Sequence, residues 1–350
     1  MVKKLKILLA ETVLILLAVC GCFDNTETED RKYVVLMGLD GTEKTEGLSD
    51  DKMLIGEDGQ YILSAGEAEL ESDIEKSSEK QKTILVRGNT IPEMRRTADM
   101  YSSKKMYFGQ LKAVVLGEDI YSQKERLTDI VYAMERMEDI NTKIVVFASD
   151  TALESVDTVM AKGAKGGLYL WDYYKNNGGE TDLNEYMNFE YLIKSMRQDE
   201  TFIIPKISVD NEEVFLDGGV VISADQFKGE ITSEDIRSAK WLKGTAEGEL
   251  ITIGNISAKV KSQEVNISDD NGSLKIEIEA SIAIESGYDV NKDEAEKEFE
   301  MSVQRSLTDT INKSVDLDAD FLQLTPDGKL DGLNFVVEAD IQIISAGVIK

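Results

Sequence analysis

The chain has 350 residues, of which 42% are hydrophobic and 30% charged, and it is long enough for one or two folded domains with their own cores. Its formal net charge of −28 opposes binding to nucleic acid phosphates and to anionic lipid headgroups, so we predict no nucleic acid partner. The sequence contains no histidine and only two cysteines, Cys20 and Cys22. These absences exclude imidazole acid–base catalysis, Ser-His-Asp and Cys-His nucleophiles, and metal sites built from cysteine and histidine.

The first 22 residues have the pattern of an export signal. A basic head with three lysines precedes the apolar run 7–19, which one glutamate and one threonine interrupt and which is too short to span a bilayer. Gly21 then precedes Cys22, a combination that resembles a lipoprotein signal, with cleavage after Gly21 and a diacylglyceryl group on the Cys22 sulfur. Cys20 is the weaker candidate because the bulky Val19 precedes it. An uncleaved N-terminal anchor is the alternative, and both interpretations place the rest of the chain outside the cytoplasm, on the membrane.

Removal of residues 1–21 takes the net charge from −28 to −30, because this segment carries three lysines and one glutamate. We therefore expect the membrane to hold the protein through its acyl chains and not through a basic patch. The only cysteine left, Cys22, would be acylated, so no disulfide is predicted. Residues 22–32 are polar and acidic and are predicted to form a tether.

Residues 33–205 are predicted to form an N-terminal α/β domain. Apolar strands are expected at 33–39, 61–65, 83–87, 111–116 and 143–148. Helices are expected after three N-cap signals, which are Thr90 with Glu93, Ser122 with Glu125, and Asp150 or Thr151. Apolar strands that alternate with helices favour a mixed or parallel sheet with flanking helices.

Residues 161–205 change character and are predicted to form the end of this domain or a separate helical subdomain. Glycines at 163, 166 and 167 precede an aromatic run that includes Trp171. An aromatic stripe of this kind is more often core than a partner surface, and both interpretations stay open. Pro205 is the predicted domain boundary.

Residues 206–350 are predicted to form a C-terminal α+β domain with an antiparallel sheet and one long helix. A hairpin is expected over 214–222, a short helix after Thr232 or Ser233, and alternating strands over 249–284 with a turn at Asn271-Gly272. The long helix follows, and a closing strand is expected at 334–344. One face of the long helix carries Phe299, Val303, Leu307 and Ile311.

Two acidic segments carry oxygens with the spacing of calcium loops. In the first, Asp289, Asn291, Asp293 and Glu300 fit, but Glu294 occupies the position that needs glycine. We interpret it as a helix start capped by Asn291. The second contains Asp316, Asp318 and Asp320 with the same defect, and is interpreted as a solvated helix end.

Two further motifs are incomplete. Ser102 and Lys105 have the spacing of Ser-Lys acyl enzymes, but the accompanying Lys-Thr-Gly is missing. Residues 163–167 lack the spacing of a phosphate-binding loop. We therefore predict no catalytic residues, no metal site and no cofactor.

A series of short motifs occurs in a defined order along the chain. They are Cys22-Phe23-Asp24, Gly38-Leu39-Asp40, Gly88-Asn89-Thr90, Phe108-Gly109-Gln110-Leu111-Lys112, Leu116-Gly117-Glu118, Met134-Glu135-Arg136, Leu216 to Val221, Phe227 to Ile231, the acidic helix near 293–313, and Asp320-Phe321. This order resembles the Ger(x)C family, the lipoprotein subunits of spore germinant receptors, over most of residues 20–345. Two positions differ, since the family often has Trp at the place of Phe23 and His at the place of Gln110.

The resemblance implies a multidomain α/β fold and a binding and assembly role without catalysis. It also implies that the protein works beside two integral membrane subunits, at the outer face of the spore's inner membrane. The main alternative is a solute-binding lipoprotein of a transporter, which needs two doubly wound lobes around a cleft. The second alternative is an extracytoplasmic hydrolase that depends on carboxylates, which needs two carboxylates that converge in one pocket.

Overall fold

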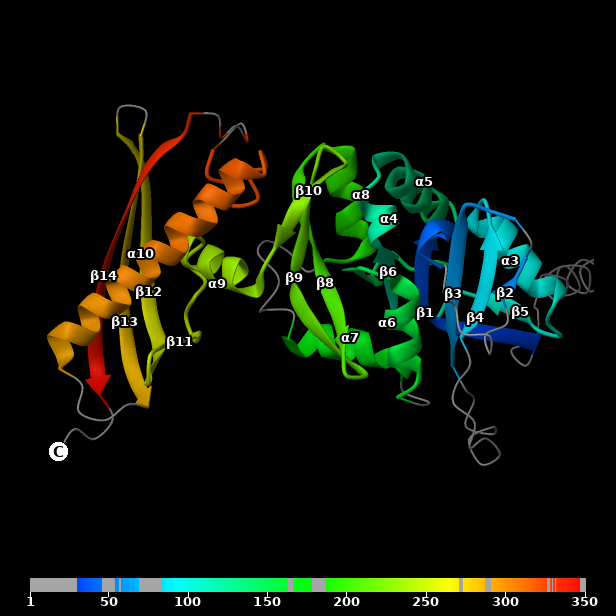
Figure 1. The fold of residues 1–350 in the computed structure, drawn as a ribbon, viewed down its shortest axis with the longest axis horizontal. Helices are drawn as coiled ribbons and strands as arrows, with labels where there is room; N and C mark the ends of the chain where they lie inside the picture. The colour runs from blue at the N-terminus through cyan, green and yellow to red at the C-terminus, as the bar shows by residue number, and fades with distance from the viewer. Residues whose placement is uncertain are drawn as a thin grey trace, which may run out of the picture.

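The computed structural model describes residues 30–45, 54–56, 58–68, 83–162, 166–177, 187–270, 273–286, 291–325, 328, 330 and 332–346. These residues form an elongated molecule with two sheets, one toward each end of its long axis (Figure 1). The larger sheet has ten strands and the smaller has four. The predicted combination of an N-terminal mixed sheet with flanking helices and a C-terminal sheet with one long helix is confirmed.

The ten-stranded sheet has the order β10-β9-β8-β7-β6-β1-β3-β4-β2, and β5 also pairs with β1. Its central strands β1, β6, β7 and β8 are parallel, and the pairs β1–β3, β3–β4, β8–β9 and β9–β10 are antiparallel. The strands are β1 (Arg31–Gly41), β2 (Leu54–Ile55), β3 (Tyr61–Glu67), β4 (Ile84–Gly88), β5 (Lys105–Tyr107), β6 (Ala113–Gly117), β7 (Val145–Ser149), β8 (Thr201–Asp210), β9 (Glu213–Ser223) and β10 (Gln226–Ile231).

The helices of this part are α3 (Ile91–Met100), α4 (Glu118–Tyr121), α5 (Lys124–Glu135), α6 (Ala152–Met160), α7 (Gly166–Asn177) and α8 (Phe189–Arg197), with a 3₁₀ turn η2 (Thr42–Thr45) after β1. The N-cap prediction at Thr90 is confirmed, since its hydroxyl accepts a hydrogen bond from the Glu93 backbone at 3.3 Å. The predicted cap at Ser122 is wrong. Ser122 has helical backbone angles and closes α4, so its side chain lacks the extended geometry of an N-cap.

Helices α7 and α8 belong to the core of the first sheet. Leu170 and Tyr174 of α7 and Phe189 and Leu192 of α8 join the same buried cluster as the strands. The predicted option of a separate helical subdomain over 161–205 therefore does not match the packing.

Pro205, the predicted domain boundary, lies inside β8 and faces Gly219 of β9. The register of these two strands shifts just after Pro205, and such an irregularity accommodates a residue that has no backbone N–H to donate. Because β8, β9 and β10 all belong to the ten-stranded sheet, sheet membership divides the chain after Ile231 and not at Pro205.

The second sheet has the order β11-β12-β13-β14. Its elements, with the helices beside them, are α9 (Ser233–Leu242), β11 (Leu250–Ile253), β12 (Ile256–Asp270), β13 (Ser273–Ser286), α10 (Lys292–Asp316) and β14 (Asn334–Ala346). Strands β11 to β13 are antiparallel as predicted, and the turn at Asn271-Gly272 lies outside the described residues. The last pair, β13–β14, is parallel, because α10 carries the chain back along the sheet before β14 begins.

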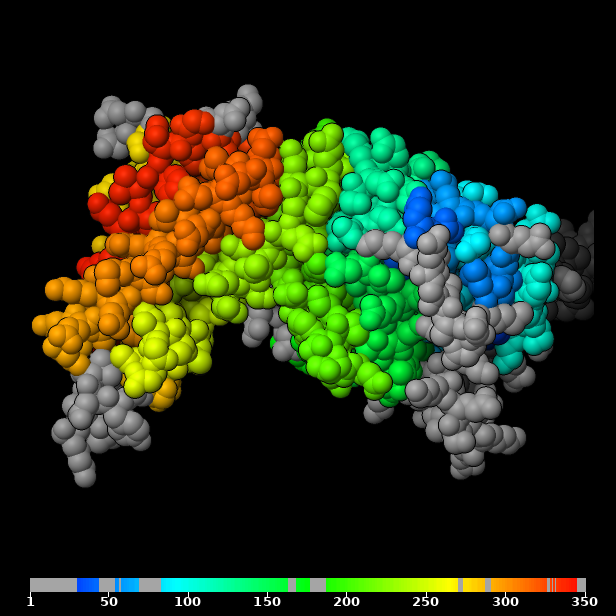
Figure 2. Space-filling model, in the orientation of Figure 1, coloured from blue at the N-terminus to red at the C-terminus, as the bar shows by residue number. Residues whose placement is uncertain are grey.

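The apolar face of α10 is buried as predicted. Phe299, Val303, Leu307 and Ile311 are each at most 4% exposed and pack on the second sheet. Strand β9 lies between the two cores, because Val220 and Ile222 belong to the first cluster and Val221, on the opposite face, belongs to the second. The two sheets are therefore packed together through β9, and Figure 2 shows one end of α10 beside the β10 side of the first sheet.

Candidate functional site

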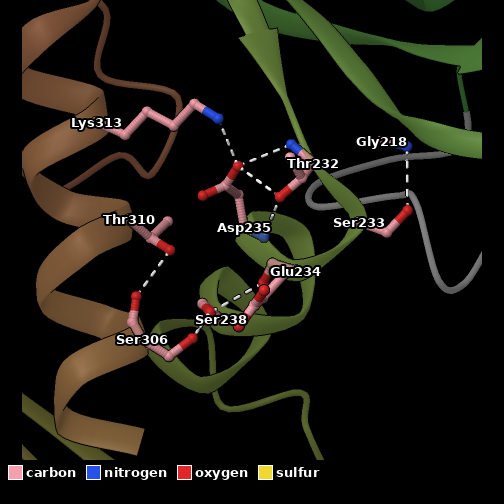
Figure 3. A network of polar contacts seen from close by, with 9 residues as sticks. All are labelled: Gly218, Thr232, Ser233, Glu234, Asp235, Ser238, Ser306, Thr310 and Lys313. Atoms are coloured by element: carbon pink, nitrogen blue, oxygen red, sulfur yellow. Dashed lines mark hydrogen bonds and ion pairs between the residues drawn. The ribbon is translucent and has the colours of Figure 1, made fainter.

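The two sheets meet at a group of polar side chains that we call the joint, defined by Thr232, Ser233, Asp235, Ser238, Ser306 and Lys313 (Figure 3). It begins where the chain leaves β10 and enters α9. The Thr232 hydroxyl accepts a hydrogen bond from the Asp235 backbone at 3.2 Å, and the Asp235 carboxylate accepts one from the Thr232 backbone at 2.7 Å. This capping box is local in sequence and confirms the predicted cap at Thr232.

Lys313, in the last turn of α10, reaches the same carboxylate. Its Nζ lies 2.7 Å from Oδ2 of Asp235, and the Asp235 side chain is only 14% exposed. Burial acts to raise the pKa of Asp235, but the hydrogen bonds from Lys313 and Thr232 outweigh it and hold the pKa below its usual value. The joint therefore contains a carboxylate that stays ionised and ties α9 to α10.

Hydroxyl groups continue this connection in both directions. The hydroxyl of Ser238 on α9 touches that of Ser306 on α10 and donates to the Glu234 carbonyl at 2.9 Å. On the other side, the Ser233 hydroxyl accepts a hydrogen bond from the Gly218 backbone of β9 at 3.1 Å (Figure 3). Helix α9 is therefore bonded to the first sheet at its N-terminus and to α10 along its length.

A second contact lies at the C-terminal end of α10. Lys228 of β10 forms an ion pair with Asp318 at 3.3 Å. Asp320 is 4% exposed, and its carboxylate accepts hydrogen bonds from the backbones of Leu324 and Thr325, each at 2.9 Å. The interpretation of this segment as a solvated helix end is wrong for Asp320, because its carboxylate organises a buried turn.

A groove of about 780 Å³ opens beside the joint, between α9, α10 and β11. Its lining includes Glu234, Arg237, Trp241, Arg305 and Asp309. Within the described residues, no group of three or more His, Cys, Asp or Glu side chains could hold a metal ion. The groove offers charged and polar groups of both signs.

The predicted lipidation and cleavage residues, Cys22 and Gly21, lie outside the described residues and stay predictions. Asp289, in the first calcium-like segment, also lies outside the described residues. The interpretation of that segment as a helix start is confirmed. Asn291 is the N-cap of α10, and its side chain accepts a hydrogen bond from the Asp293 backbone at 3.2 Å. In the described part of the chain, no helix is long and apolar enough to cross a membrane.

The structure gives the other motifs local roles. The Ser102 hydroxyl accepts a hydrogen bond from the Lys104 backbone at 3.1 Å, so it shapes the turn after α3. Gly166 and Gly167 begin α7, while residues 163–165 lie outside the described residues. In the aromatic run, Tyr174 is buried and packs edge-on against Phe147 with ring centres 5.3 Å apart, whereas Trp171 is partly buried. This part of the run belongs to the core.

Sequence reasoning missed two long-range contacts made by carboxylates. Asp235 and Lys313 are 78 residues apart, and no local pattern connects them. Asp40 is fully buried and accepts hydrogen bonds from the backbones of Ala152 and Leu153, each at 2.8 Å, across a separation of more than 100 residues. The available signal for Asp40 was a lone carboxylate at the end of an apolar strand, which is unusual because buried carboxylates need partners.

Comparisons with known proteins cover most of the chain. Residues 24–209 match the family model described as "Spore germination protein N-terminal domain", and residues 217–326 match the model described as "Spore germination B3/ GerAC like, C-terminal". Spore germination protein A3 of Bacillus subtilis (strain 168) is 19% identical over 237 residues, which are 68% of this chain and 60% of that protein. The alignment thus spans less than two thirds of that relative's length.

The crystal structure of the GerBC protein has the same fold. It superposes with a TM-score of 0.52 at 15% sequence identity, and the superposition covers 88% of this chain and 97% of the other. The arrangement of a mixed sheet, a second sheet and one long helix is therefore shared with a solved structure over nearly the whole of that protein.

Proposed function

The chain belongs to the spore germination B3/GerAC-like family, and from this premise we propose that it is a lipid-anchored, non-catalytic subunit of a spore germinant receptor. It acts through contacts with integral membrane subunits, at the outer face of the spore's inner membrane. The observation that carries the proposal is the match of both family models, in order, over residues 24–209 and 217–326.

Acylation of Cys22 is the anchoring step of this proposal. Two or three acyl chains hold a protein on a bilayer far more firmly than one, and confinement to the surface raises the effective concentration beside membrane partners. Modest contact surfaces then suffice for assembly. The signal-like segment that ends at Gly21 and Cys22 supports this step.

The joint has a defined part in this function. Shared packing around β9, the Asp235–Lys313 ion pair and the Lys228–Asp318 ion pair hold the two sheets in one orientation. A subunit built this way presents surfaces of both sheets to its partners in fixed relation, as an assembly role needs.

The test has two parts. Incorporation of labelled palmitate into the protein is expected to be lost in Cys22→Ala and kept in the matched variant Cys20→Ala. Co-purification from spore membranes is expected to recover two integral membrane subunits with the wild-type protein. Palmitate labelling that persists in Cys22→Ala would contradict the anchor, and purification of the protein alone from intact spore membranes would contradict the receptor role.

The transporter alternative is not favoured by the geometry. A solute-binding lipoprotein needs two doubly wound lobes that enclose a cleft. In the described residues, the second sheet has four strands and packs on the first sheet through β9, so it is not a doubly wound lobe. The large groove lies beside α9 and α10 and not between two such lobes. No cofactor or metal enters the proposed function.

A further inference from the structure

One end of the described molecule carries basic and apolar side chains together, in contrast to the net charge of −28. This end is formed by the start of β1, the C-terminal end of α3, and β5, which packs on both. We call it the basic end, and its residues are Arg31, Arg96, Met100, Tyr101, Lys104 and Lys105. Figure 1 shows α3 and β5 at one end of the long axis and the sheet of β11 to β14 at the other.

The basic side chains lie over an aromatic base. The guanidinium of Arg31 lies 4.5 Å from the centre of the Tyr107 ring, and Tyr33 packs edge-on against the same ring at 5.8 Å. Arg31, Lys105 and Tyr107 line one depression of about 540 Å³, together with the carboxylates Glu138 and Asp139. The position of Arg31 is thus held by packing, which leaves its charge available at the surface.

Within the described residues, the basic side chains of this end are not held in ion pairs. Arg95 beside them is paired with Asp139 at 3.0 Å, and the Asp99 carboxylate accepts a hydrogen bond from the Met106 backbone at 2.7 Å. In the part of the chain that the structure describes, neither Arg96 nor Lys105 has an ion-pair partner. Lys104 has none there either. Among the residues described, the basic end therefore carries four cations outside ion pairs, with Asp99 and Glu138 as nearby carboxylates.

Large apolar side chains stand exposed beside these charges. Met100 is 68% exposed and Tyr101 is 64% exposed, and both lie at the end of α3. Aromatic and long apolar side chains next to lysine and arginine suit the interface of a bilayer, because aromatic rings lie there at the level of the headgroups and basic side chains reach the phosphates.

The path of the chain leads to the same place. Only eight residues, 23–30, separate Cys22 from Arg31 at the start of β1. Extended chain reaches at most about 3.5 Å per residue, so the basic end lies within roughly 30 Å of the Cys22 sulfur. Chemistry and tether length therefore point to one occupant for this surface, which is the headgroup layer in which the acyl chains insert.

We propose that the basic end rests on the anionic headgroups of the anchoring membrane, with Met100 and Tyr101 at the interface and the second sheet directed away from the bilayer. This inference rests on the proposed acylation of Cys22. It reverses the expectation that the membrane is held by acyl chains without a basic patch, because a local group of unpaired cations makes the contact while most of the acidic surface is held at a distance. Screening limits the repulsion from those distant charges.

The experiment uses the full-length protein with its native anchor, bound to vesicles of phosphatidylcholine with or without phosphatidylglycerol. A fluorescent label is placed at Ser103→Cys in the basic end, or at the matched control Ser268→Cys on β12, since both serines are exposed. A nitroxide-carrying lipid reports how closely each label approaches the bilayer. We expect several-fold stronger quenching at position 103 than at 268, and a further increase with phosphatidylglycerol.

Charge reversal tests the cause. Lys104→Glu with Lys105→Glu is expected to lower the docked population by roughly fivefold per lysine and to reduce quenching at position 103. The control, Lys297→Glu with Arg305→Glu on α10, changes the net charge by the same amount. It is expected to leave the quenching at position 103 unchanged. Protein that sediments with vesicles but shows equal quenching at both positions overturns the basic end alone. Protein that does not sediment overturns the anchor and the basic end together.

Discussion

The carboxylate of Asp40 caps the helix that begins at Ala152, with Oδ1 2.8 Å from the Ala152 backbone nitrogen. Oδ2 accepts from the next residue, Leu153, at the same distance. Asp40 is the last residue but one of the central strand β1, so one side chain connects the middle of the ten-stranded sheet to the N-terminus of α6. Gly117 makes this approach possible, because a Cβ at this position would lie 2.1 Å from Oδ1 of Asp40.

Removal of this cap is expected to destabilise the whole protein. Asp40→Ala deletes two charge-assisted hydrogen bonds at a fully buried helix N-terminus and should lower the free energy of unfolding by about 2–4 kcal/mol. Urea denaturation followed by circular dichroism measures the change. The control Asp172→Ala, on the exposed side of α7, is expected to stay within about 0.5 kcal/mol of the wild-type protein. Equal stability of the two variants would show that α6 does not depend on Asp40.

The ion pair at the joint predicts a pH dependence. The pKa of Asp235 lies below 3.8 in the folded protein, so its stabilising contribution is present above pH 3.8 and lost as the pH falls through the folded value. Asp235→Asn should lower the free energy of unfolding at pH 7 by about 1–3 kcal/mol. The difference from the wild-type protein should shrink as the pH falls below 3.8. Asp309→Asn on the exposed face of α10 serves as control, and a difference that grows in acid would contradict the assignment.

Gly218 occupies a backbone conformation and a space that both require glycine. Its φ is +72°, and a Cβ there would lie 1.9 Å from the carbonyl oxygen of Ile231. Gly254 also has a positive φ, +58°, but no atom lies within 4 Å of its Cβ position. Gly218→Ala is therefore expected to cost clearly more than Gly254→Ala, for which only the strain of about 1–2 kcal/mol applies. Thermal unfolding of both variants measures this, and equal costs would mean that the strand shifts without penalty.

Two carboxylates of α10 protect the edge of the second sheet. Glu296 accepts a hydrogen bond from the Ile343 backbone of β14 at 2.7 Å, and Glu300 accepts one from Ile341 at 3.4 Å. Glu296→Ala should lower the free energy of unfolding by about 1–3 kcal/mol and expose a strand edge that can pair between molecules. Urea denaturation and light scattering measure the two effects. Glu298→Ala, exposed on the same helix, is the control and is expected to scatter no more than the wild-type protein.

Local patterns were sufficient for most of the secondary structure. The apolar stripe of α10 and the caps at Thr90 and Thr232 follow from residues within a few positions of each other, and each is present in the structure. Pro205 lies inside β8 and not where the chain changes sheet, because a shift in strand register accommodates the proline there. The anchor at Cys22 stays a prediction from the sequence.

The sequence by itself determined most of the elements, the classes of catalysis and metal site that are excluded, and the family resemblance, because these depend on composition and on short spacings. Only the tertiary structure decided that β8 to β10 extend the first sheet, that β14 runs parallel to β13, that Asp40 caps α6, and that Asp235 pairs with Lys313. These contacts join residues that lie far apart in the chain. Their formation depends on strand order and helix packing, which hydrophobic patterns leave open because several topologies bury the same apolar faces.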